Sequence, residues 1–489
     1  MYLSKLLECL SGWEIEGKIE DWDREITSLS IDTKKCKKGA LFVCLKGENI
    51  DSHTLTLEAE KAGSVAILAQ ESVTTNLPVI RVEDTRKAVG LLASLFYGEP
   101  CKHLKMIGIT GTNGKTTSSY MLASILRNAG KNVGVIGTLG IIYNEKRLPS
   151  LLTTPDSIEL HACLADMLAA GVEYVVMEVS AHALYYKKTE GIHFTACIFT
   201  NFTQDHLNFF GNMEAYKKAK MSLFTPERCA VAILNGDDEV GREIANMREK
   251  QAGRVVFYGL TTPVDCFAII TDESIKGTEC VFNLNDNLYR VRLRMLGEYS
   301  VYNALATAAC AQMLQCEKAI SLGLYQMKNV QGRLQKVEGI GVAEVYVDFA
   351  HTPDGLEKSL QTLKKYCAGR LICLFGCGGN RDKSKREKMG KIAAKLCDFA
   401  ILTSDNPRYE DPLDIIDQIE CGYRSLSNRY VVVPDRQKAL DYALDYLSKE
   451  DILLVAGKGG EDYQEIMGIK YPFNDQDMVI KLMRKKGKI

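Results

Sequence analysis

Short apolar runs alternate with segments of helical periodicity through the middle and the last third of the chain. In the middle these runs are Val133–Ile136, Tyr174–Met177, Cys197–Thr200 and Val231–Leu234. In the last third they are Val345–Val347, Leu371–Phe375, Phe399–Leu402, Tyr430–Val433 and Ile452–Val455. Apolar strands separated by helices are typical of parallel sheets covered on both faces. We therefore predict an α/β protein.

The chain is long enough for more than one hydrophobic core. Its 489 residues correspond to about three domains at ~150 residues each. The pattern places these domains at residues 1–98, 99–332 and 333–489. The first domain also contains strand-like runs, at Leu41–Leu45, Val65–Leu68 and Pro78–Val82.

The segment Gly108–Thr117 connects the apolar run that begins at Met106 to a helical pattern over Ser118–Asn128. A strand, a glycine-containing turn and a helix N-terminus together form an anion site, because backbone N–H groups and the helix dipole favour negative charge. Lys115 can reach the outer phosphates of a nucleotide, and the Thr116 hydroxyl can bind magnesium. The segment therefore predicts a phosphate-binding loop.

This loop departs from the usual G-x-x-x-x-G-K-[ST] pattern. Ile109 stands where the first glycine is expected, with Gly108 one residue before it and Gly111 two residues after it. The alternative interpretation is a surface turn with a solvated lysine. The strand before the turn and the helix after it favour the phosphate loop.

Polar clusters follow several of the predicted strands. In the middle domain they are Glu178–His182, Asn201–His206 and Asn235–Asp238, and in the last domain Asp348–His351, Gly376–Asp382, Asp405–Arg408 and Gly457–Glu461. The carboxyl ends of parallel strands meet at one edge of a sheet, where ligands bind. The clusters of the middle domain therefore predict one site that they share with the phosphate loop. A lone histidine such as His206 is more often part of a core than a ligand, but its place beside this loop favours the ligand.

Composition excludes some classes of protein. The formal net charge is −1, which provides no general basic field for nucleic acid or membrane surfaces. The 16 cysteines show no C-x-x-C spacing and indicate reduced thiols in a reducing compartment. The N-terminus has no secretory pattern, and no apolar run approaches the ~20 residues of a membrane helix. We expect a cytoplasmic protein.

Two N-terminal segments carry weaker signals. Ser30–Lys34 and the loop Gly47–His53 are rich in groups that can bind a sugar or a nucleotide. A solvated loop explains both segments equally well.

These motifs, in this order, resemble those of the Mur ligases, and within that family the MurE type, which builds the tripeptide of the peptidoglycan precursor. The resemblance covers nearly the whole chain. It rests on Gly111–Thr117, Thr153–Pro155, Glu178–Ser180, Thr200–Leu207, Tyr216–Lys220, Asn303–Ala304, Gly332–Arg333, Asp348–His351 and Asp405–Arg408. Folylpolyglutamate and cyanophycin synthetases resemble the chain in the phosphate loop and the ligase core, but they lack Asp405–Arg408 in this form.

The resemblance implies an N-terminal UDP-substrate domain, a central ATPase-like domain and a C-terminal Rossmann-like domain. It implies an ATP-dependent ligase, with magnesium as cofactor, that adds meso-diaminopimelate to the D-Glu carboxylate of UDP-MurNAc-L-Ala-D-Glu through an acyl phosphate. We expect neither a nucleic-acid nor a membrane partner, and we expect a monomer.

The resemblance also assigns residues to roles. The ATP-binding set is Gly111, Thr112, Asn113, Gly114, Lys115, Thr116, Thr117, Asn303, Arg333 and Asp348. The catalytic set is Lys115, Glu178, His206 and Lys220, and the metal set is Thr116, Glu178, His206 and Lys220, the last as a carbamate. The UDP-substrate set is Ser30, Asp32, Thr153, Thr154, Ser180 and Lys188. The amino-acid set is Arg381, Asp405, Asn406, Arg408, Gly457 and Glu461.

Only the resemblance selects Lys220. From the sequence alone, Lys217, Lys218 and Lys220 read as a solvated helix face. Carbamylation requires an uncharged amine, so the surroundings of Lys220 must depress its pKa.

The resemblance implies the acceptor amino acid, because Asp405–Arg408 has the form found in ligases that add meso-diaminopimelate, and charge gives a physical reason for this choice. The distal head of meso-diaminopimelate carries a carboxylate, which Arg408 can pair, and an ammonium, which Glu461 can pair. Lysine lacks this carboxylate and would leave a guanidinium unpaired in a closed pocket. L-Lysine or another amino acid remains the alternative acceptor.

Several positions depart from the family pattern: Thr33-Lys34, Ala181, Tyr186-Lys187-Lys188, Asn208 and Gly460. None of them removes a phosphate-binding or magnesium-binding group. They leave open a related acceptor or a paralogue outside the main pathway. A nucleotide-binding regulator that has lost catalysis is a separate alternative, and the intact Lys115, Glu178, His206 and Lys220 argue against it.

Overall fold

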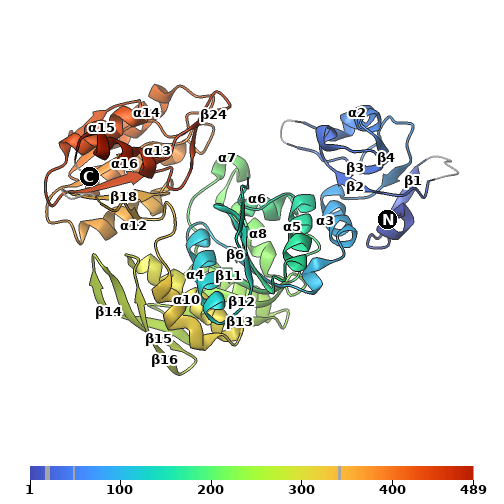
Figure 1. Cartoon of the computed structure of the whole chain (residues 1–489), viewed down its shortest axis with the longest axis horizontal. Coiled ribbons are helices and arrows are strands. Elements are labelled where there is room, and N and C mark those ends of the chain that lie inside the picture. The colour runs from blue at the N-terminus through green and yellow to red at the C-terminus, as the bar shows by residue number, and fades with distance from the viewer. Residues whose placement is uncertain (17–21, 48–49, 151, 340–342, 488–489) are drawn as a thin grey trace. The chain divides into compact units, whose positions relative to one another are not determined.

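The strands of the chain form separate sheets, each with its own helices. The computed structural model describes residues 1–16, 22–47, 50–150, 152–339 and 343–487. In this part of the chain, the strands form sheets of five, eleven, six and two strands (Figure 1). The chain divides into two compact units, each made of several segments: Met1–Gly108, Lys131–Cys197 and Ala219–Val231 in the first, and Ile109–Gly130, Ile198–Lys218 and Ala232–Ile489 in the second.

The N-terminal residues of the first unit form a five-stranded sheet in the order β1-β5-β4-β3-β2. Its strands are β1 Glu14–Glu16, β2 Ser28–Ser30, β3 Ala40–Val43, β4 Ser64–Ala69 and β5 Val79–Arg81, and its helices are α1 Leu3–Leu7, α2 Thr56–Lys61 and α3 Thr85–Phe96. All neighbouring strands are parallel except β1 and β5. Alternate residues of the strands face opposite cores, so that Leu41 packs with α1 and α3 and Phe42 packs with α2.

The eleven-stranded sheet has the order β16-β15-β14-β13-β12-β11-β6-β10-β7-β8-β9. Its strands are β6 Lys105–Thr110, β7 Val133–Gly137, β8 Gly140–Tyr143, β9 Lys146–Leu148, β10 Tyr174–Glu178, β11 Phe194–Phe199, β12 Cys229–Asn235, β13 Arg254–Gly259, β14 Cys266–Ser274, β15 Gly277–Leu284 and β16 Asn287–Leu293. The helices of this region are α4 Lys115–Asn128, α5 Ser157–Ala169, α6 Ala181–Tyr185, α7 Leu207–Phe210, α8 Met213–Met221, α9 Glu239–Glu249, α10 Glu298–Met313 and α11 Ile320–Gln326.

The two ends of this sheet differ from the parallel sheet that the apolar pattern predicts. Strand β15 is antiparallel to its neighbours β14 and β16, and strand β8 is antiparallel to its neighbours β7 and β9. In β14 and β15, buried residues alternate with less buried ones, because one-sided antiparallel strands need only one apolar face. Such strands give no continuous apolar run, so the pattern that finds buried parallel strands misses them.

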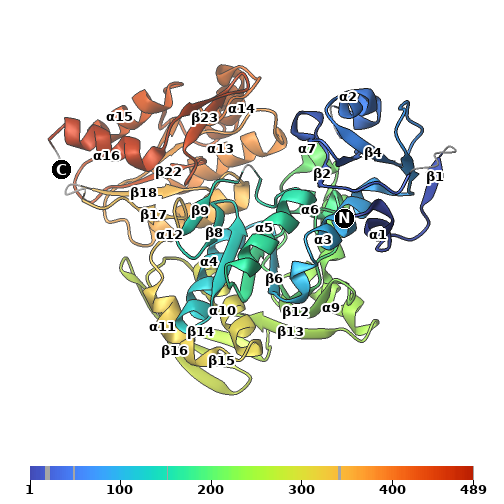
Figure 2. The same ribbon diagram turned by 45° about the vertical axis from the view of Figure 1, so that its right-hand side comes forward.

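The C-terminal part of the second unit contains the six-stranded sheet, in the order β17-β18-β22-β19-β20-β21. Its strands are β17 Gln335–Lys336, β18 Glu344–Asp348, β19 Leu371–Phe375, β20 Phe399–Leu402, β21 Tyr430–Val432 and β22 Ile452–Ala456, with β23 Tyr463–Ile466 and β24 Ile469–Pro472 as a separate hairpin. The helices are α12 Pro353–Lys364, α13 Ser384–Leu396, α14 Pro412–Arg424, α15 Arg436–Tyr446 and α16 Asp475–Lys485. Cys373 belongs to a core cluster with residues of α12, α13 and α14, and its neighbour Leu374 belongs to a second cluster with residues of α15 and α16. Figure 2 shows these helices around the sheet.

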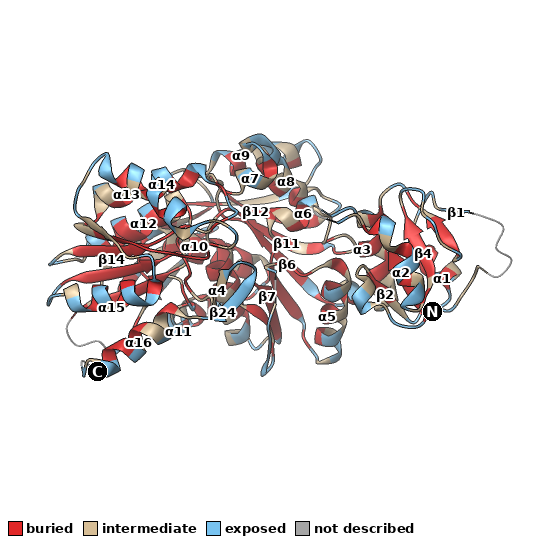
Figure 3. Cartoon of the chain, turned by 90° about the horizontal axis from the view of Figure 1, so that it is seen from above, coloured by how far each residue is buried: buried red, intermediate tan, exposed pale blue. Residues whose placement is uncertain are grey.

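The α/β prediction is confirmed, and most predicted apolar runs are strands with ends that differ by a few residues. The strands are buried along most of their length, whereas the helices turn exposed residues outward (Figure 3). Among the described residues, no helix combines the length and the apolar character that a membrane span requires.

Candidate active site

The predicted phosphate loop connects β6 to α4, and two of its glycines have backbone angles that other residues rarely adopt. Gly111 has φ +148° and Gly114 has φ +89°. A Cβ atom on Gly111 would lie 1.9 Å from Thr200 Oγ1, and one on Gly114 would lie 2.4 Å from Asn303 Oδ1. Gly111 therefore provides the close approach that the first glycine of the usual pattern would provide.

The segment after β11 fixes the shape of this loop. The N–H groups of Thr112 and Asn113 donate to the main-chain and side-chain oxygens of Asn201, at 2.8 and 2.9 Å. The Thr200 hydroxyl and the Asn201 amide both donate to Asn113 O, at 2.6 and 3.1 Å. These bonds leave the first turn of α4 as the part of the loop that can face an anion.

The first turn of α4 carries the predicted residues Lys115, Thr116 and Thr117. Lys115 Nζ donates to the carbonyl oxygens of Gly111 and Thr112, each at 2.9 Å. Thr116 is buried, and its Oγ1 accepts a hydrogen bond of 3.0 Å from Arg333 Nη2. The ammonium of Lys115 and the guanidinium of Arg333 thus both lie at this loop, and both are groups that can pair with phosphate.

Two further predicted ATP residues are also buried in this unit. Asn303 lies on α10, beside the phosphate loop. Asp348 Oδ1 accepts from Ala350 N at 2.7 Å and from Ser359 Oγ at 3.3 Å, and Asp348 Oδ2 accepts from Leu334 N. Burial raises the pKa of Asp348 despite these donors and the nearby charge of Arg333. The Asp348 carboxylate thus fixes the turn that carries Arg333.

His206 is not a core histidine, since 36% of its side chain is exposed. It has φ +56° at the start of α7. Its Nε2 lies 3.3 Å from Asp205 Oδ2, and Nε2 of His351 lies 3.6 Å from the same oxygen. Burial acts to raise the pKa of Asp205, but the hydrogen bond from His351 and the charge of His206 outweigh it, and the pKa lies well below its usual range. Asp205 and His351 lie within predicted motifs, but the sequence assigns neither residue a role.

In the first unit, Glu178 ends β10 with a buried carboxylate. It accepts hydrogen bonds from Thr138 N at 2.9 Å and from Thr138 Oγ1 at 3.1 Å. A Cβ atom on Gly137 would lie 2.1 Å from Glu178 Oε1. Gly137 and Thr138 thus position the carboxylate, and the sequence analysis misses both although they directly follow a predicted strand.

Three predicted substrate residues gather around the end of the same strand. Thr154 Oγ1 donates to Glu178 O at 2.9 Å and accepts from Ser180 N at 3.1 Å. Thr153 Oγ1 lies 3.2 Å from Thr138 Oγ1. A fourth, Lys188, forms an ion pair of 2.7 Å with Asp156.

The three lysines of α8 have different surroundings. Lys218 is exposed, and Lys217 forms ion pairs of 3.1 and 2.8 Å with Glu214 and Glu243. Lys220 is 1% exposed. A solvated helix face therefore does not describe Lys220, the lysine that the resemblance selects.

The N-terminal candidates lie next to their own strands. Ser30, at the end of β2, donates its hydroxyl to Asp32 O at 2.8 Å, and Asp32 Oδ1 accepts from Lys34 N at 2.9 Å. In the predicted loop Gly47–His53, His53 Nδ1 lies 2.6 Å from Asp51 Oδ1. Residues 48 and 49 of that loop lie outside the described residues.

The predicted amino-acid residues meet at the carboxyl edge of the six-stranded sheet. Asn406 Nδ2 donates to Glu461 Oε2 at 2.8 Å. Gly457 has φ +112°, and a Cβ atom there would lie 2.4 Å from Asp405 Oδ2. Arg381 is more exposed and lies beside Gly378, as does Arg408.

Two charged residues without a predicted role belong to the same cluster: Lys458, which lies within the predicted segment Gly457–Glu461, and Glu465. The ammonium of Lys458, whose side chain is 0% exposed, donates to Asn406 Oδ1 and Glu461 Oε2, each at 3.0 Å. Glu465 Oε2 accepts from Arg408 Nε at 3.0 Å. Lys458 and Arg408 thus each have a carboxylate partner in this cluster.

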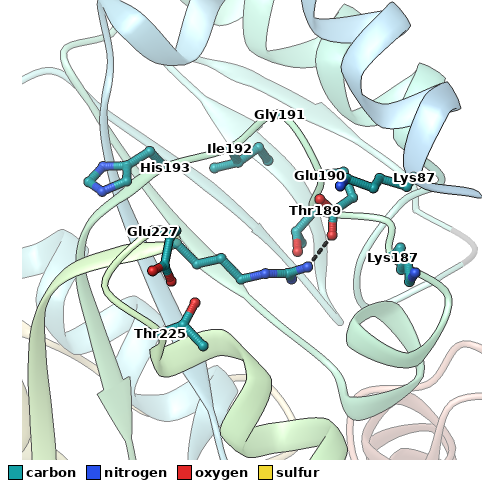
Figure 4. Close-up of a pocket in the computed structure, with 10 residues that line it drawn as sticks. Lys87, Lys187, Thr189, Glu190, Gly191, Ile192, His193, Thr225 and Glu227 are labelled. Carbon is teal, nitrogen blue, oxygen red and sulfur yellow. Dashed lines mark hydrogen bonds and ion pairs between the residues drawn. The ribbon is translucent and has the colours of Figure 1, made fainter. Parts of the chain in front are cut away.

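A cleft of about 540 Å³ opens in the first unit, and none of the predicted binding residues lines it (Figure 4). Its basic side chains include Lys87 and Lys187, and its acid Glu190 is paired with Arg228. The cleft thus lies apart from the residues to which the resemblance assigns roles.

Among the residues that the structure describes, no three His, Cys, Asp or Glu side chains gather as metal ligands. Magnesium beside a nucleotide needs only one or two carboxylates, since phosphates and water complete its shell. The Glu178 carboxylate and the Thr116 hydroxyl are oxygen donors of the kind that magnesium prefers.

Family models match most of the chain. Residues 109–311 match the Mur ligase middle domain, residues 332–459 match the glutamate ligase domain of Mur ligases, and residues 25–97 match the Mur ligase family catalytic domain.

Curated relatives match over nearly their full length. A UDP-N-acetylmuramoyl-L-alanyl-D-glutamate--2,6-diaminopimelate ligase of Geobacillus thermodenitrificans is 37% identical over 97% of this chain and 98% of its own. The ligase of that name from Caldanaerobacter subterraneus subsp. tengcongensis is 39% identical over 99% and 100%. Ligase 1 of that name from Clostridium acetobutylicum is 40% identical over 98% and 99%.

Solved structures of Mur ligases have a fold similar to that of this chain. A structure of a ligase with the same name has a TM-score of 0.68 at 28% identity and covers 94% of this chain and 95% of that chain. MurF ligase from Thermotoga maritima, solved in complex with ADP, has a TM-score of 0.62 at 18% identity, with 94% and 97% covered, and supports the fold. The resemblance found in the motifs is confirmed.

Proposed function

This chain is a Mur ligase, and we propose that it uses ATP to join meso-diaminopimelate to UDP-MurNAc-L-Ala-D-Glu in peptidoglycan precursor synthesis. The observation that carries the proposal is the full-length relationship to 2,6-diaminopimelate ligases at 37–40% identity. The arginine-bearing motif Asp405–Arg408 supports the same acceptor.

The reaction has two chemical stages. The terminal D-Glu carboxylate attacks the γ-phosphorus of ATP, so that ADP leaves and an acyl phosphate forms. The amine of the amino acid then attacks the acyl carbon, loses a proton, and expels inorganic phosphate to give the amide. Because two anions must meet in the first stage, the protein contributes mainly positioning and neutralisation of charge.

Lys115 and Arg333 provide the positive charge for the triphosphate. In the structure the Lys115 ammonium rests on carbonyl oxygens of its own loop, from which it can reach the outer phosphates. The Arg333 guanidinium lies 4.3 Å from the centre of the Phe349 ring and donates to Thr116. Asn303 would contact the adenine and Asp348 the ribose.

We assign Thr116, Glu178 and His206 to magnesium, which when bound would neutralise charge on the phosphates and on the acceptor carboxylate. Thr138 orients Glu178 through two hydrogen bonds, and Asp205 orients His206. These partners hold the side chains of Glu178 and His206 in fixed orientations.

Lys220 would carry a carbamate, formed when its neutral amine adds CO₂ and releases a proton. The burial of Lys220 supports this assignment, because burial favours an uncharged amine. A high-resolution crystal map of active protein at ample bicarbonate should show a carboxylate on Nζ. A plain ammonium in that map would overturn the assignment.

The UDP-muramoyl substrate would contact Ser30, Asp32, Thr153, Thr154, Ser180 and Lys188. We place the reaction in the cytoplasm of a monomeric enzyme. The sixteen cysteines form no disulfide in the described part of the chain and are mostly buried, which supports a reducing compartment.

The decisive experiment is a panel of amino acids with ATP and UDP-MurNAc-L-Ala-D-Glu. We expect phosphate release that requires both the UDP substrate and an amino acid, with meso-diaminopimelate as the best acceptor. Phosphate release without that dependence, or none at all, would favour a regulatory protein over a ligase. Arg408→Ala should reduce the use of meso-diaminopimelate far more than that of L-lysine.

A further inference from the structure

The guanidinium of Arg408 is held from two sides by neighbouring groups. It belongs to the cluster of Asn406, Arg408, Lys458, Glu461 and Glu465, which we call the distal pocket. Its Nε donates to Glu465 Oε2 at 3.0 Å and its Nη1 donates to Gly379 O at 2.9 Å. The side chains of Arg408 and Glu465 are only 15% and 21% exposed. The ion pair is therefore mostly shielded from water, where the contribution of a charge pair is larger than on an open surface.

The backbone makes this pairing a fixed feature. Arg408 N donates to Glu465 O at 3.0 Å, and Met467 N donates to Arg408 O at 2.7 Å. Glu465 N also donates to Asn406 Oδ1 at 2.9 Å. The hairpin β23–β24 is thus bonded directly to the loop that binds the amino acid, and Glu465 has little freedom to leave Arg408.

The pairing leaves one edge of the guanidinium for a ligand. Glu465 and Gly379 engage Nε and one Nη1 hydrogen of Arg408, so the edge formed by Nη1 and Nη2 can still receive a carboxylate in bidentate form. The two ion pairs nevertheless add no net charge to the pocket, because Glu465 balances Arg408 and Glu461 balances Lys458.

We propose that Glu465 is a specificity-determining residue that neutralises Arg408 and so lets the distal pocket accept diamino acids that lack the second carboxylate. The proposal rests on the proposed amide-ligase function. An unpaired, shielded guanidinium would penalise L-lysine strongly, since a buried charge without a partner is costly. With Glu465 in place the guanidinium is already paired, and the two carboxylates of the pocket can receive a terminal ammonium.

The test compares meso-diaminopimelate with L-lysine in the wild type and in Glu465→Gln. Glutamine keeps the shape and an oxygen that accepts from Arg408 Nε, and it removes only the charge. We expect kcat/KM for L-lysine to fall about tenfold or more, mainly through KM, while that for meso-diaminopimelate stays level or rises. An unchanged ratio of the two values in a folded variant would overturn the proposal.

Three further measurements keep the test independent of how Glu465→Gln folds. Glu465→Asp retains the charge and should keep the ratio close to that of the wild type, whereas Glu387→Gln, which breaks an exposed pair with Lys391 on α13, should change nothing. In the wild type itself, discrimination against L-lysine should stay well below the roughly 10⁴-fold of a site with an unsatisfied partner. Discrimination at that level would contradict the proposal, and a wild type inactive with every amino acid would instead contradict the ligase function.

Discussion

At the scale of single residues, Gly137 controls the position of a carboxylate that the proposed reaction needs. A Cβ atom there would lie 2.1 Å from Glu178 Oε1, so Gly137→Ala must displace the carboxylate. We expect kcat to fall about 100-fold, because misplacement of a catalytic group by ~1 Å has an effect of this size. Steady-state kinetics with a thermal unfolding curve would measure it.

Gly134 provides a matched control in the same strand. A Cβ atom there would meet the flexible end of Met167, at 2.8 Å from Sδ, and that side chain can move. Gly134→Ala should cost about 1–2 kcal/mol of stability and leave kcat near the wild-type value. Equal losses of activity in the two variants would show that the strand, and not the carboxylate, is responsible.

Arg333 tests the proposed contacts with the triphosphate. The variant Arg333→Lys would lose the contact of the guanidinium with the Phe349 ring and the hydrogen bond from Nη2 to Thr116. An ammonium group is not planar and cannot donate two parallel hydrogen bonds as a guanidinium does. We expect Arg333→Lys to raise KM for ATP about tenfold. The control Arg294→Lys, in which the stack on Tyr325 at 4.6 Å is lost, should leave KM for ATP unchanged.

At the scale of elements, a buried ion pair connects α13 to the segment before α14. Arg386, on α13, is 0% exposed and donates to both oxygens of Glu410, at 2.9 and 3.0 Å. Glu410→Gln leaves this guanidinium without a carboxylate. The expected loss is about 3 kcal/mol of unfolding free energy at pH 7, measured by chemical denaturation.

The pH dependence of that loss follows from Glu410. Its hydrogen bonds with Arg386 lower its pKa from 4.5 to about 2. A carboxyl group with a lowered pKa stabilises the folded state above its unfolded pKa, and the contribution disappears as pH falls through the folded pKa. The difference between wild type and Glu410→Gln should therefore be constant above pH 4.5 and shrink below it. A difference that stays constant down to pH 3 would contradict this account.

At the scale of the whole molecule, the C-terminal sheet has nearly all of its core within one contiguous segment. Both hydrophobic clusters of that sheet come almost entirely from residues after 332, with Leu296 as the buried exception. We expect residues 333–489, expressed alone, to unfold in a single cooperative transition followed by circular dichroism. This experiment tests the predicted domain boundary directly.

A shorter fragment provides the comparison. Residues 371–489 lack β17 and β18, and β18 pairs with β22 along its whole length, from Glu344 to Asp348. Removal of β18 uncovers the edge of β22 and one side of both cores, so this fragment should show no cooperative transition. A cooperative transition in the shorter fragment would place the domain boundary elsewhere.

The sequence by itself determined the α/β class, the buried strands, the glycine-containing turn between a strand and a helix, and the family. Apolar runs, glycines beside a lysine and motifs in a fixed order are all properties of neighbouring residues. That this turn binds phosphate remains a prediction. The resemblance also assigned Arg408 and Glu461 to one amino-acid pocket. The roles of these residues and the domain boundaries remain predictions.

Only the tertiary structure decided which groups pair. It buried Lys220 while it left Lys218 exposed, brought Thr138 to Glu178, and set Glu465 against Arg408 across more than fifty residues of chain. It also ended the sheet with antiparallel strands that lack a continuous apolar run. The physical reason is that burial and the pairing of charges depend on distances through space, and the local pattern of a sequence does not contain these distances.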